Sequence, residues 1–282
     1  MSTVKPFLKW AGGKSRVAKQ ISSFFPKNFN NYYEPFLGSG AIFFSILPKT
    51  GLLNDLNKYL IGTYTVIKQK PEKLIDELAK IDFAYHSLST LDDKAIFYYD
   101  ARSEYNSIRT KNVKKAALFI FLNKAGFNGM YRENSKGEYN IPFGKHERCL
   151  MCDAENIRRV SKKIRNIDFT HVDYRLALKT AKKDDFVYID PPYIPISKTA
   201  SFTQYQKDGF GIDDHINLAN TALELHNRGC YIVISNSFCK ESVKLYNLPN
   251  FKINKIKVTR QIHASRKVVP EIVVTNFNNE RA

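Results

Sequence analysis

The segment Tyr32-Tyr33-Glu34-Pro35-Phe36-Leu37-Gly38-Ser39-Gly40 gives the clearest indication of the fold class. Its first residues predict a strand that runs into a glycine-rich loop, and Ala41-Ile42-Phe43-Phe44 predicts a helix after that loop. Leu52-Leu53-Asn54-Asp55 then predicts a second short strand. A strand, a tight turn, a helix and a second strand form the unit that is typical of nucleotide-binding α/β domains.

The same alternation returns after about residue 149. Apolar runs predict strands at 169–172, 186–189 and 231–235, and helical spacing predicts helices at 157–167 and 214–227. The tail alternates apolar and polar residues at 253–259 and 271–277, which predicts an antiparallel strand pair. The predicted fold class is therefore α/β with a Rossmann-like sheet.

Between these parts the pattern is helical. Apolar residues recur at helical spacing from about residue 58 to 148, without strand alternation, and 126–147 is rich in glycine and asparagine. We therefore expect one domain from 1–58 and 149–282, and a helical insertion at 59–148 that ends in a projecting hairpin or loop near 127–145.

The charge of the chain favours an acidic partner. Its 44 Lys and Arg residues outnumber its 27 Asp and Glu residues, so the formal charge is +17. Nucleic acid is the expected partner, because each neutralised phosphate releases counterions; the alternative is a basic protein without such a partner. Arg158, Arg159, Lys162, Lys163 and Arg165 form one basic stretch, and Lys252, Lys255, Lys257, Arg260, Arg266 and Lys267 form another.

Other classes of protein are disfavoured. No apolar run approaches the ~18 residues of a membrane span, and residues 1–6 lack the apolar core of a signal peptide. Four cysteines are too few for a disulfide scaffold of this size, and the Cys149/Cys152 pair lacks a second CxxC for zinc. We expect a cytoplasmic protein without a metal site.

Asp190-Pro191-Pro192-Tyr193 is the strongest candidate site. It directly follows a buried strand, where open α/β sheets place their active-site loops. Two prolines remove two amide donors, so the turn presents carbonyl oxygens and the Asp190 carboxylate. Such a turn suits an amino group. The lone pair of an adenine amino nitrogen is delocalised into the ring, and this nitrogen would become more nucleophilic if Asp190 and the Pro191 carbonyl accepted hydrogen bonds from both of its hydrogens. The alternative is a rigid turn with a capping aspartate.

Two further motifs suggest a bound nucleotide-like ligand. The loop at 37–40 lets a ligand approach the backbone closely, although an ordinary tight turn has the same glycines. Asp55 could hold ribose hydroxyls or cap the following helix. Gly12-Gly13-Lys14-Ser15 resembles part of a phosphate-binding loop, but the full pattern needs glycine where Leu8 stands, which argues against a nucleotide hydrolase.

Taken together, these motifs resemble those of Dam-type DNA adenine methyltransferases, in the same order. They are 7–14 (Phe-Leu-Lys-Trp-Ala-Gly-Gly-Lys), 34–40, Asn54-Asp55, 127–132 (Phe-Asn-Gly-Met-Tyr-Arg), 190–193, and the tail 270–276. The resemblance implies an S-adenosylmethionine-dependent methyltransferase sheet with a helical target-recognition insertion. It also implies direct transfer to the amino group of a flipped adenine in double-stranded DNA, with no metal and no covalent intermediate.

The resemblance assigns the donor-binding residues. Trp10 and Lys14 would contact S-adenosylmethionine, with Lys14 near its carboxylate, and Asp55 would hold its ribose. Asp173 and Tyr174 would form the pocket for its adenine, and Asp190 would touch both donor and target. The residues that would wrap its methionine part are Glu34, Pro35, Phe36, Gly38, Ser39 and Gly40.

The resemblance also assigns DNA contacts, for which a solvated loop is the alternative. Arg132 matches an arginine that reads a guanine in GATC-specific members, which is the commonest specific contact in the major groove. His146 and Met130 stand where some members have tyrosine and leucine. The resemblance implies an adenine within GATC as the target, and His146 belongs to the predicted DNA-binding residues. Lys9 would contact the first guanine, and Met130 and Pro142 would face a thymine methyl. Phe127 and Asn128 would lie near the gap that the flipped base leaves in the duplex, and Asn134 and Lys145 would contact phosphates.

Alternatives remain from two other classes. An RNA or protein methyltransferase could use the same pocket, and an inactive methyltransferase scaffold could serve as a DNA-binding module. The sequence indicates no obligatory protein partner, but a cognate restriction endonuclease could accompany a modification enzyme of this kind.

Overall fold

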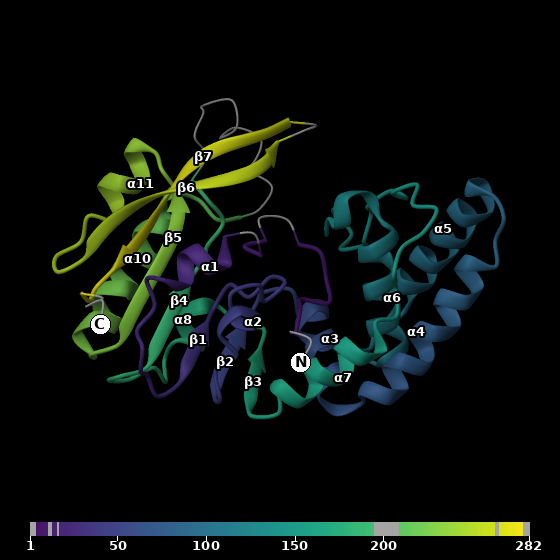
Figure 1. The fold of residues 1–282 in the computed structure, drawn as a ribbon, viewed down its shortest axis with the longest axis horizontal. Coiled ribbons are helices and arrows are strands. Elements are labelled where there is room, and N and C mark those ends of the chain that lie inside the picture. Colours follow the sequence, from purple (N-terminus) through teal and green to yellow (C-terminus); the bar gives the residue numbers. More distant parts are fainter. Residues whose placement is uncertain (1–3, 11–12, 16, 195–208, 263–264, 279–282) are drawn as a thin grey trace. The chain divides into compact units, whose positions relative to one another are not determined.

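The computed structural model describes residues 4–10, 13–15, 17–194, 209–262 and 265–278, and it leaves out the side chains at 259–267. The chain divides into two compact units, which are described separately (Figure 1). Unit 1 comprises Met1–Lys14, Gly38–Leu47 and Asn57–His171, and unit 2 comprises Ser15–Leu37, Pro48–Leu56 and Val172–Ala282.

A mostly parallel sheet is the framework of unit 2. Its strands run in the order β2-β1-β4-β5-β7-β6. Neighbouring strands from β2 to β5 pair in parallel, whereas β7 pairs antiparallel with both β5 and β6. The strands are β1 (Tyr32–Glu34), β2 (Gly51–Asn54), β4 (Phe186–Ile189), β5 (Tyr231–Ser237), β6 (Lys252–Ile262) and β7 (Ser265–Thr275).

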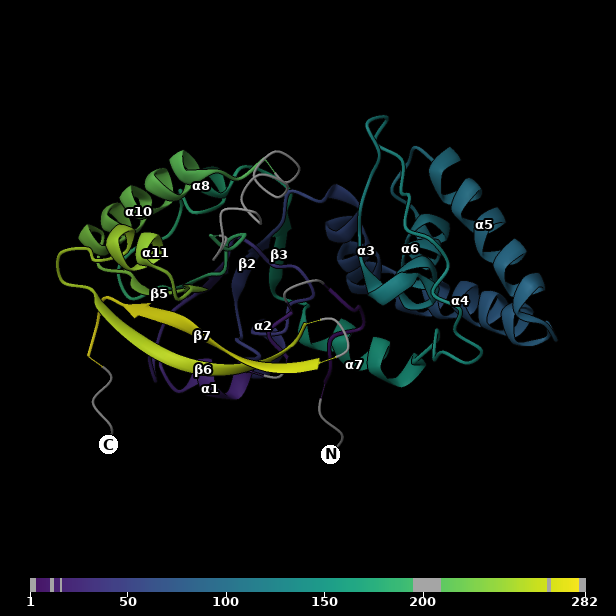
Figure 2. The same cartoon turned by 90° about the horizontal axis from the view of Figure 1, so that it is seen from above.

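Helices cover both faces of this sheet. Figure 2 shows α8 (Tyr174–Ala177), α10 (Ile212–Asn227) and α11 (Lys240–Leu245) on one side of the strands and α1 (Ala18–Ser22) on the other. Coverage of both faces explains why β4 is a continuous buried run and does not alternate with polar residues.

Successive residues of each strand point to opposite faces. Val187 and Ile189 of β4 pack with Leu218 of α10 in one core. Phe186 packs on the opposite side against Phe25, with ring centroids 4.9 Å apart. We call this second side the α1 face; by the same alternation it carries Tyr188 and Ser235.

Unit 1 is mainly helical. Its longer helices are α3 (Lys58–Gln69), α4 (Pro71–His86), α5 (Leu91–Ser107), α6 (Val113–Ala125) and α7 (Ala154–Lys163). α6 is buried on all sides over Ala116–Leu122, as expected of a central apolar helix. The shorter elements are α2 (Phe43–Ile46), a 3₁₀ turn η1 (Phe127–Gly129) and β3 (Ile167–Thr170).

The α/β fold class is confirmed, and so is the antiparallel tail pair. The extents differ. β6 and β7 each have 11 residues. β6 ends at Ile262, after the predicted end at 259, and β7 begins at Ser265, before the predicted start at 271. α7 spans Ala154–Lys163 and β3 begins at Ile167, so the predicted helix 157–167 begins and ends too late in the sequence. No helix among the described residues is long and apolar enough to cross a membrane.

Candidate active site

Three carboxylates of unit 2 mark the candidate site, and we call them the carboxylate cluster: Glu34, Asp190 and Glu271. Glu34 ends β1, Asp190 is the first residue after β4, and Glu271 lies on β7 opposite Ser237 of β5. Glu34 and Glu271 are each only 2% exposed, whereas Asp190 is half-buried. Because β1 and β4 are parallel, Glu34 and Asp190 lie where these strands end at the same edge of the sheet. Glu271 reaches this edge from the antiparallel strand β7, where it pairs with the last residue of β5.

Each carboxylate of the cluster accepts a hydrogen bond from a hydroxyl. Tyr32 Oη donates to Glu34 Oε2 at 2.7 Å, and Ser235 Oγ donates to Asp190 Oδ1 at 2.7 Å. Tyr193 Oη donates to Glu271 Oε2 at 2.9 Å. Buried carboxylates are costly unless they are hydrogen-bonded, so these donors offset part of the cost of burial and orient the three side chains.

The tyrosines around the cluster remain protonated. Burial raises the pKa of Tyr32, Tyr188 and Tyr193 well above its ordinary value, and the Asp190 carboxylate adds to the effect in all three. The phenol groups are therefore hydrogen-bond donors at neutral pH.

The tetrapeptide at 190–193 is fixed at its far end by β5. The Asn236 side chain accepts a hydrogen bond from the Ile194 amide at 3.1 Å, and Ser237 Oγ donates to the Ile194 carbonyl at 2.6 Å. Pro191 is buried and Pro192 is exposed. The turn is thus held rigidly at both ends while part of its surface stays accessible, as a preorganised acceptor site requires.

His215 of α10 supports the middle of this turn. It is 1% exposed, its Nδ1 lies 2.9 Å from Tyr246 Oη, and its ring hydrogen-bonds the Pro192 carbonyl. Since a carbonyl only accepts, the ring donates to Pro192 and Nδ1 accepts from Tyr246. Burial lowers the pKa of His215 to about 4, so the ring is neutral at neutral pH.

This histidine predicts an acid-sensitive stability. Its folded pKa of about 4 lies below the ordinary 6.5, so its contribution is complete above pH 6.5 and is lost as the pH falls towards 4. We expect the wild type to lose roughly 2 kcal/mol more unfolding free energy than His215→Gln between pH 7 and pH 4.5, measured by denaturant titration. His171→Gln, at an exposed position, should behave as the wild type does. Equal losses in the wild type and His215→Gln would contradict this role.

Of the other donor-side predictions in unit 2, Phe36 and Tyr174 lie side by side. The rings of Phe36 and Tyr174 are 5.5 Å apart, and Asp55 follows β2 directly. Asn57 caps α3 by accepting from the Tyr59 and Leu60 amides, so the alternative role of Asp55 as that cap is wrong. Pro35 is buried.

Asp173 has a structural partner that the sequence did not suggest. It caps α8 and lies 2.8 Å from Arg175, whose guanidinium lowers the pKa of the Asp173 carboxyl. The carboxylate of Asp173 therefore stabilises the start of α8 and binds Arg175.

Unit 1 contains the remaining donor-side predictions, Trp10, Lys14, Gly38, Ser39 and Gly40. Gly38 has φ +52°, and a Cβ there would lie 2.9 Å from Trp10 Cδ1. This close approach, with a left-handed backbone, requires glycine. Gly40 also has φ +67°, and Lys14 and Ser39 are buried at 5% exposure each.

The segment 126–144 of unit 1 is a hairpin-like loop. Antiparallel bridges join Gly126 to Phe143 and Glu133 to Tyr139. Between them the Asn140 amide donates to the Arg132 carbonyl at 3.1 Å. At the tip, the Asn134 side chain accepts from the amides of Lys136 and Glu138, so part of the polar character of Asn134 maintains the turn.

The side chains predicted to face DNA are mostly exposed on this loop. Phe127 is 50% exposed, and Asn128 has a left-handed backbone at φ 53°. Arg132 is exposed, and its Nε donates to Asn140 Oδ1 at 2.8 Å, which orients the guanidinium plane. Asn134, Pro142 and Lys145 are exposed, Met130 and His146 are half-buried, and burial lowers the pKa of His146.

Lys9 lies beside the loop. Buried Asn123 of α6 accepts from the Lys9 amide at 2.9 Å and donates to the carbonyls of Lys9 and Gly129 at 2.8 and 2.9 Å. The Lys9 side chain is exposed. One buried amide thus holds the N-terminal segment against the turn η1.

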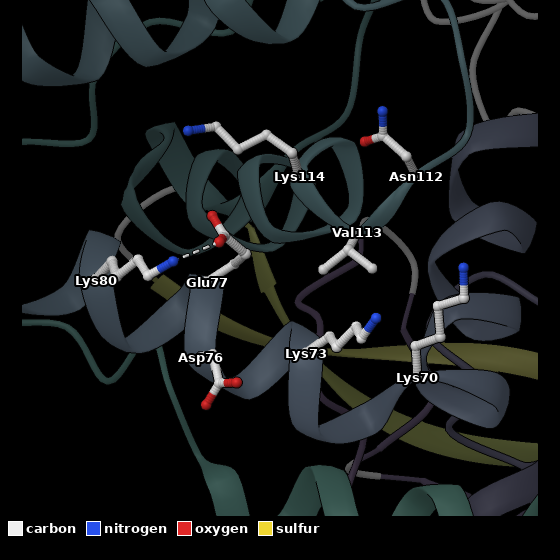
Figure 3. Close-up of a pocket in the computed structure, with 8 residues that line it drawn as sticks. All are labelled: Lys70, Lys73, Asp76, Glu77, Lys80, Asn112, Val113 and Lys114. Carbon is white, nitrogen blue, oxygen red and sulfur yellow. Dashed lines mark hydrogen bonds and ion pairs between the residues drawn. The ribbon is translucent and has the colours of Figure 1, made fainter.

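A surface pocket elsewhere in unit 1 contains none of the predicted site residues. It lies between α4 and the start of α6 and encloses about 540 Å³ (Figure 3). An ion pair joins Lys80 to Glu77 at 2.7 Å within it. Its lining residues are Lys70, Lys73, Asp76, Glu77, Lys80, Asn112, Val113 and Lys114.

The sequence did not single out Tyr32, Tyr188, Ser235, His215 or Glu271 for a role. One signal was available for Ser235. Ser235 is the last residue of the predicted strand 231–235, and Asp190 directly follows the predicted strand 186–189. Ile189 pairs with Ile234, so the two polar residues are the next in register. The other four required knowledge of which elements pack together.

Comparison with known proteins shows the family of the chain. A family model described as D12 class N6 adenine-specific DNA methyltransferase matches residues 10–262. The Type II methyltransferase M1.LlaDCHI of Lactococcus lactis subsp. cremoris is 36% identical over 284 residues, which cover 98% of this chain and 96% of that protein.

Two further relatives cover nearly as much. The Type II methyltransferase M.MjaIII of Methanocaldococcus jannaschii is 37% identical and covers 97% of this chain and 99% of its own. A DNA adenine methylase of Haemophilus influenzae is 34% identical and covers 92% of this chain and 87% of its own.

Proposed function

Since the chain belongs to the D12 class of N6 adenine-specific DNA methyltransferases, we propose that it takes the methyl group from S-adenosylmethionine and transfers it to a flipped adenine in double-stranded DNA. We further propose GATC as the recognition sequence. The catalytic residues of this proposal are Asp190, Pro191, Pro192 and Tyr193.

The observation that carries the proposal is the carboxylate cluster with its rigid turn. The Asp190 carboxylate and the Pro191 carbonyl can only accept hydrogen bonds, which suits the two hydrogens of an adenine amino group. Accepting both would draw the nitrogen lone pair out of the ring and towards the methyl group. The half-buried ring of Tyr193, held by Glu271, would stack on the flipped base.

The residues of the site also fit the donor. S-adenosylmethionine supplies a methyl group on a positively charged sulfonium, and a negative carboxylate cluster favours a cation nearby. In unit 2, Glu34 and Asp55 would accept hydrogen bonds, and the rings of Phe36 and Tyr174 would contact an adenine. In unit 1, Lys14 would pair with the carboxylate of the donor. The close approach of Gly38 to Trp10 would shape the protein turn that wraps the methionine part of the donor.

DNA recognition is assigned to the helical part of the chain. The proposal keeps 59–148 as the target-recognition domain and 1–58 with 149–282 as the catalytic domain. The exposed side chains of Arg132, Pro142 and Lys145 support it, because base and phosphate contacts need accessible groups. The names of two relatives as Type II methyltransferases support pairing with a restriction endonuclease, and the substrate implies a cytoplasmic protein.

A labelled-donor assay tests the proposal. The purified protein is incubated with methyl-labelled S-adenosylmethionine and, separately, with a GATC duplex, a duplex in which only that site is scrambled, RNA of the same sequence, and a basic protein. We expect label in the GATC duplex alone, on adenine N6. Label in RNA or protein would contradict the substrate, and equal label in both duplexes would contradict the recognition sequence only.

A further inference from the structure

Two buried hydroxyls, those of Tyr188 and Ser235, form a chain of hydrogen bonds that ends at Asp190. Tyr188 Oη lies 2.9 Å from Ser235 Oγ, and Ser235 Oγ lies 2.7 Å from Asp190 Oδ1. Both Tyr188 and Ser235 are 0% exposed, and they project from neighbouring strands onto the α1 face. The contact between Tyr188 and Ser235 is therefore buried, whereas the contact between Ser235 and half-buried Asp190 is partly buried.

The chemistry of the groups fixes the direction of both hydrogen bonds. An ionised carboxylate only accepts, so the single Ser235 proton is donated to Asp190. The Ser235 oxygen then accepts from Tyr188, which becomes the donor. Burial, together with the nearby Asp190 carboxylate, raises the pKa of Tyr188, so its proton stays in place.

We propose that Tyr188 and Ser235 form a hydroxyl relay that positions Asp190 for methyl transfer. The inference rests on the proposed role of Asp190. The relay holds Oδ1 of the carboxylate and so fixes its rotation, which would keep the carboxylate oriented towards the amino group. Ser235 and Tyr188 are positioning residues, because they act through Asp190 without touching the substrate.

Strand pairing makes the relay rigid. Tyr188 pairs with Val233, and Ile189 with Ile234, so Ser235 is the next residue along β5 as Asp190 is the next after β4. The hydroxyl of Ser235 is therefore carried by a strand with neighbours on both sides, β4 and β7. A group that must hold a catalytic rotamer benefits from such support, since small displacements of a reacting atom cost large factors in rate.

A double-mutant cycle on kcat tests the relay. We expect Ser235→Ala to lower kcat by about 10–100-fold, because it removes a hydrogen bond to a charged group. Tyr188→Phe should lower kcat by about 3–10-fold, as for a neutral hydrogen bond. In the Ser235→Ala background, Tyr188→Phe should change kcat by less than about twofold, because it acts only through Ser235. The KM values for DNA and donor should change little in all three variants.

Matched variants separate the relay from general damage to the fold. Ser235→Thr keeps the hydroxyl and should recover most of the kcat that alanine loses. Tyr33→Phe removes a tyrosine hydroxyl from β1 that contacts Thr180, and it should leave kcat unchanged. Melting temperatures of all variants are recorded, so that rates are compared only between folded proteins.

The outcomes are distinct. Independent effects of the two changes, with Tyr188→Phe costing the same factor in both backgrounds, would overturn the relay, as would a normal kcat in Ser235→Ala. The proposed function fails separately, if Asp190→Ala still methylates DNA. An inactive Asp190→Ala together with a normal Ser235→Ala would leave the function standing and remove the relay.

Discussion

Asp190→Ala is expected to lower kcat for methyl transfer by at least about 10³-fold, at the upper end of what positioned acceptors contribute. In the proposed mechanism the change removes the carboxylate that accepts a hydrogen bond from the amino group and leaves the Pro191 carbonyl as the remaining acceptor of the turn. The Ser235 hydroxyl also loses its acceptor, at 2.7 Å in the wild type. Single-turnover methylation of a saturating duplex measures the effect on the chemical step.

DNA affinity should be nearly unaffected by the same change. The predicted phosphate and base contacts lie on unit 1, whereas Asp190 lies on unit 2, so we expect a Kd for the duplex within about threefold of wild type. Asp213→Ala, which removes an exposed carboxylate from α10, is the control for loss of one negative charge. Near wild-type transfer by Asp190→Ala would show that the catalytic centre is elsewhere.

Arg132→Ala is expected to relax the choice of one guanine by about 5–150-fold, equivalent to roughly 1–3 kcal/mol. In the structure its guanidinium is exposed and is oriented by the 2.8 Å bond from Nε to Asn140. An arginine held in this way can present its remaining N–H groups to the edge of a guanine. Competition between a GATC duplex and duplexes with each base replaced in turn measures the discrimination.

Two matched variants refine this prediction. Asn140→Ala keeps the arginine but removes its orienting partner, so it should lose part of the discrimination. Lys136→Ala, which removes a cation from the exposed tip of the same loop, should weaken binding to all duplexes alike. An unchanged order of preference among duplexes in Arg132→Ala would exclude the loop as the reader of that base.

Local pattern predicted much of the fold. The run Phe186–Ile189 is apolar throughout because both faces of β4 are covered, and the alternating tail pairs antiparallel. The ends of the helices and strands were harder to predict, because they depend on helix caps and on neighbouring strands. Asn57, rather than Asp55, starts α3, and β6 extends to Ile262 because β7 continues beside it.

The candidate site also has one part that the sequence predicts and one part that it does not. Asp190 was recognisable because its neighbours in sequence define its chemistry, namely an apolar strand before it and two prolines after it. Ser235, Glu271 and His215 act on that turn from positions far along the chain. Their roles follow from strand order and helix packing, which one sequence does not display.

The position of Glu271 has a consequence for the time at which the enzyme becomes competent. Tyr193 and its carboxylate partner are 78 residues apart, and that partner lies on β7, the last strand in chain order. At a translation rate of about 5–20 residues per second, the ribosome needs roughly 4–16 s to reach Glu271 after it has added Tyr193. During that interval the nascent chain has every residue of the 190–193 turn but not the strand that holds its tyrosine.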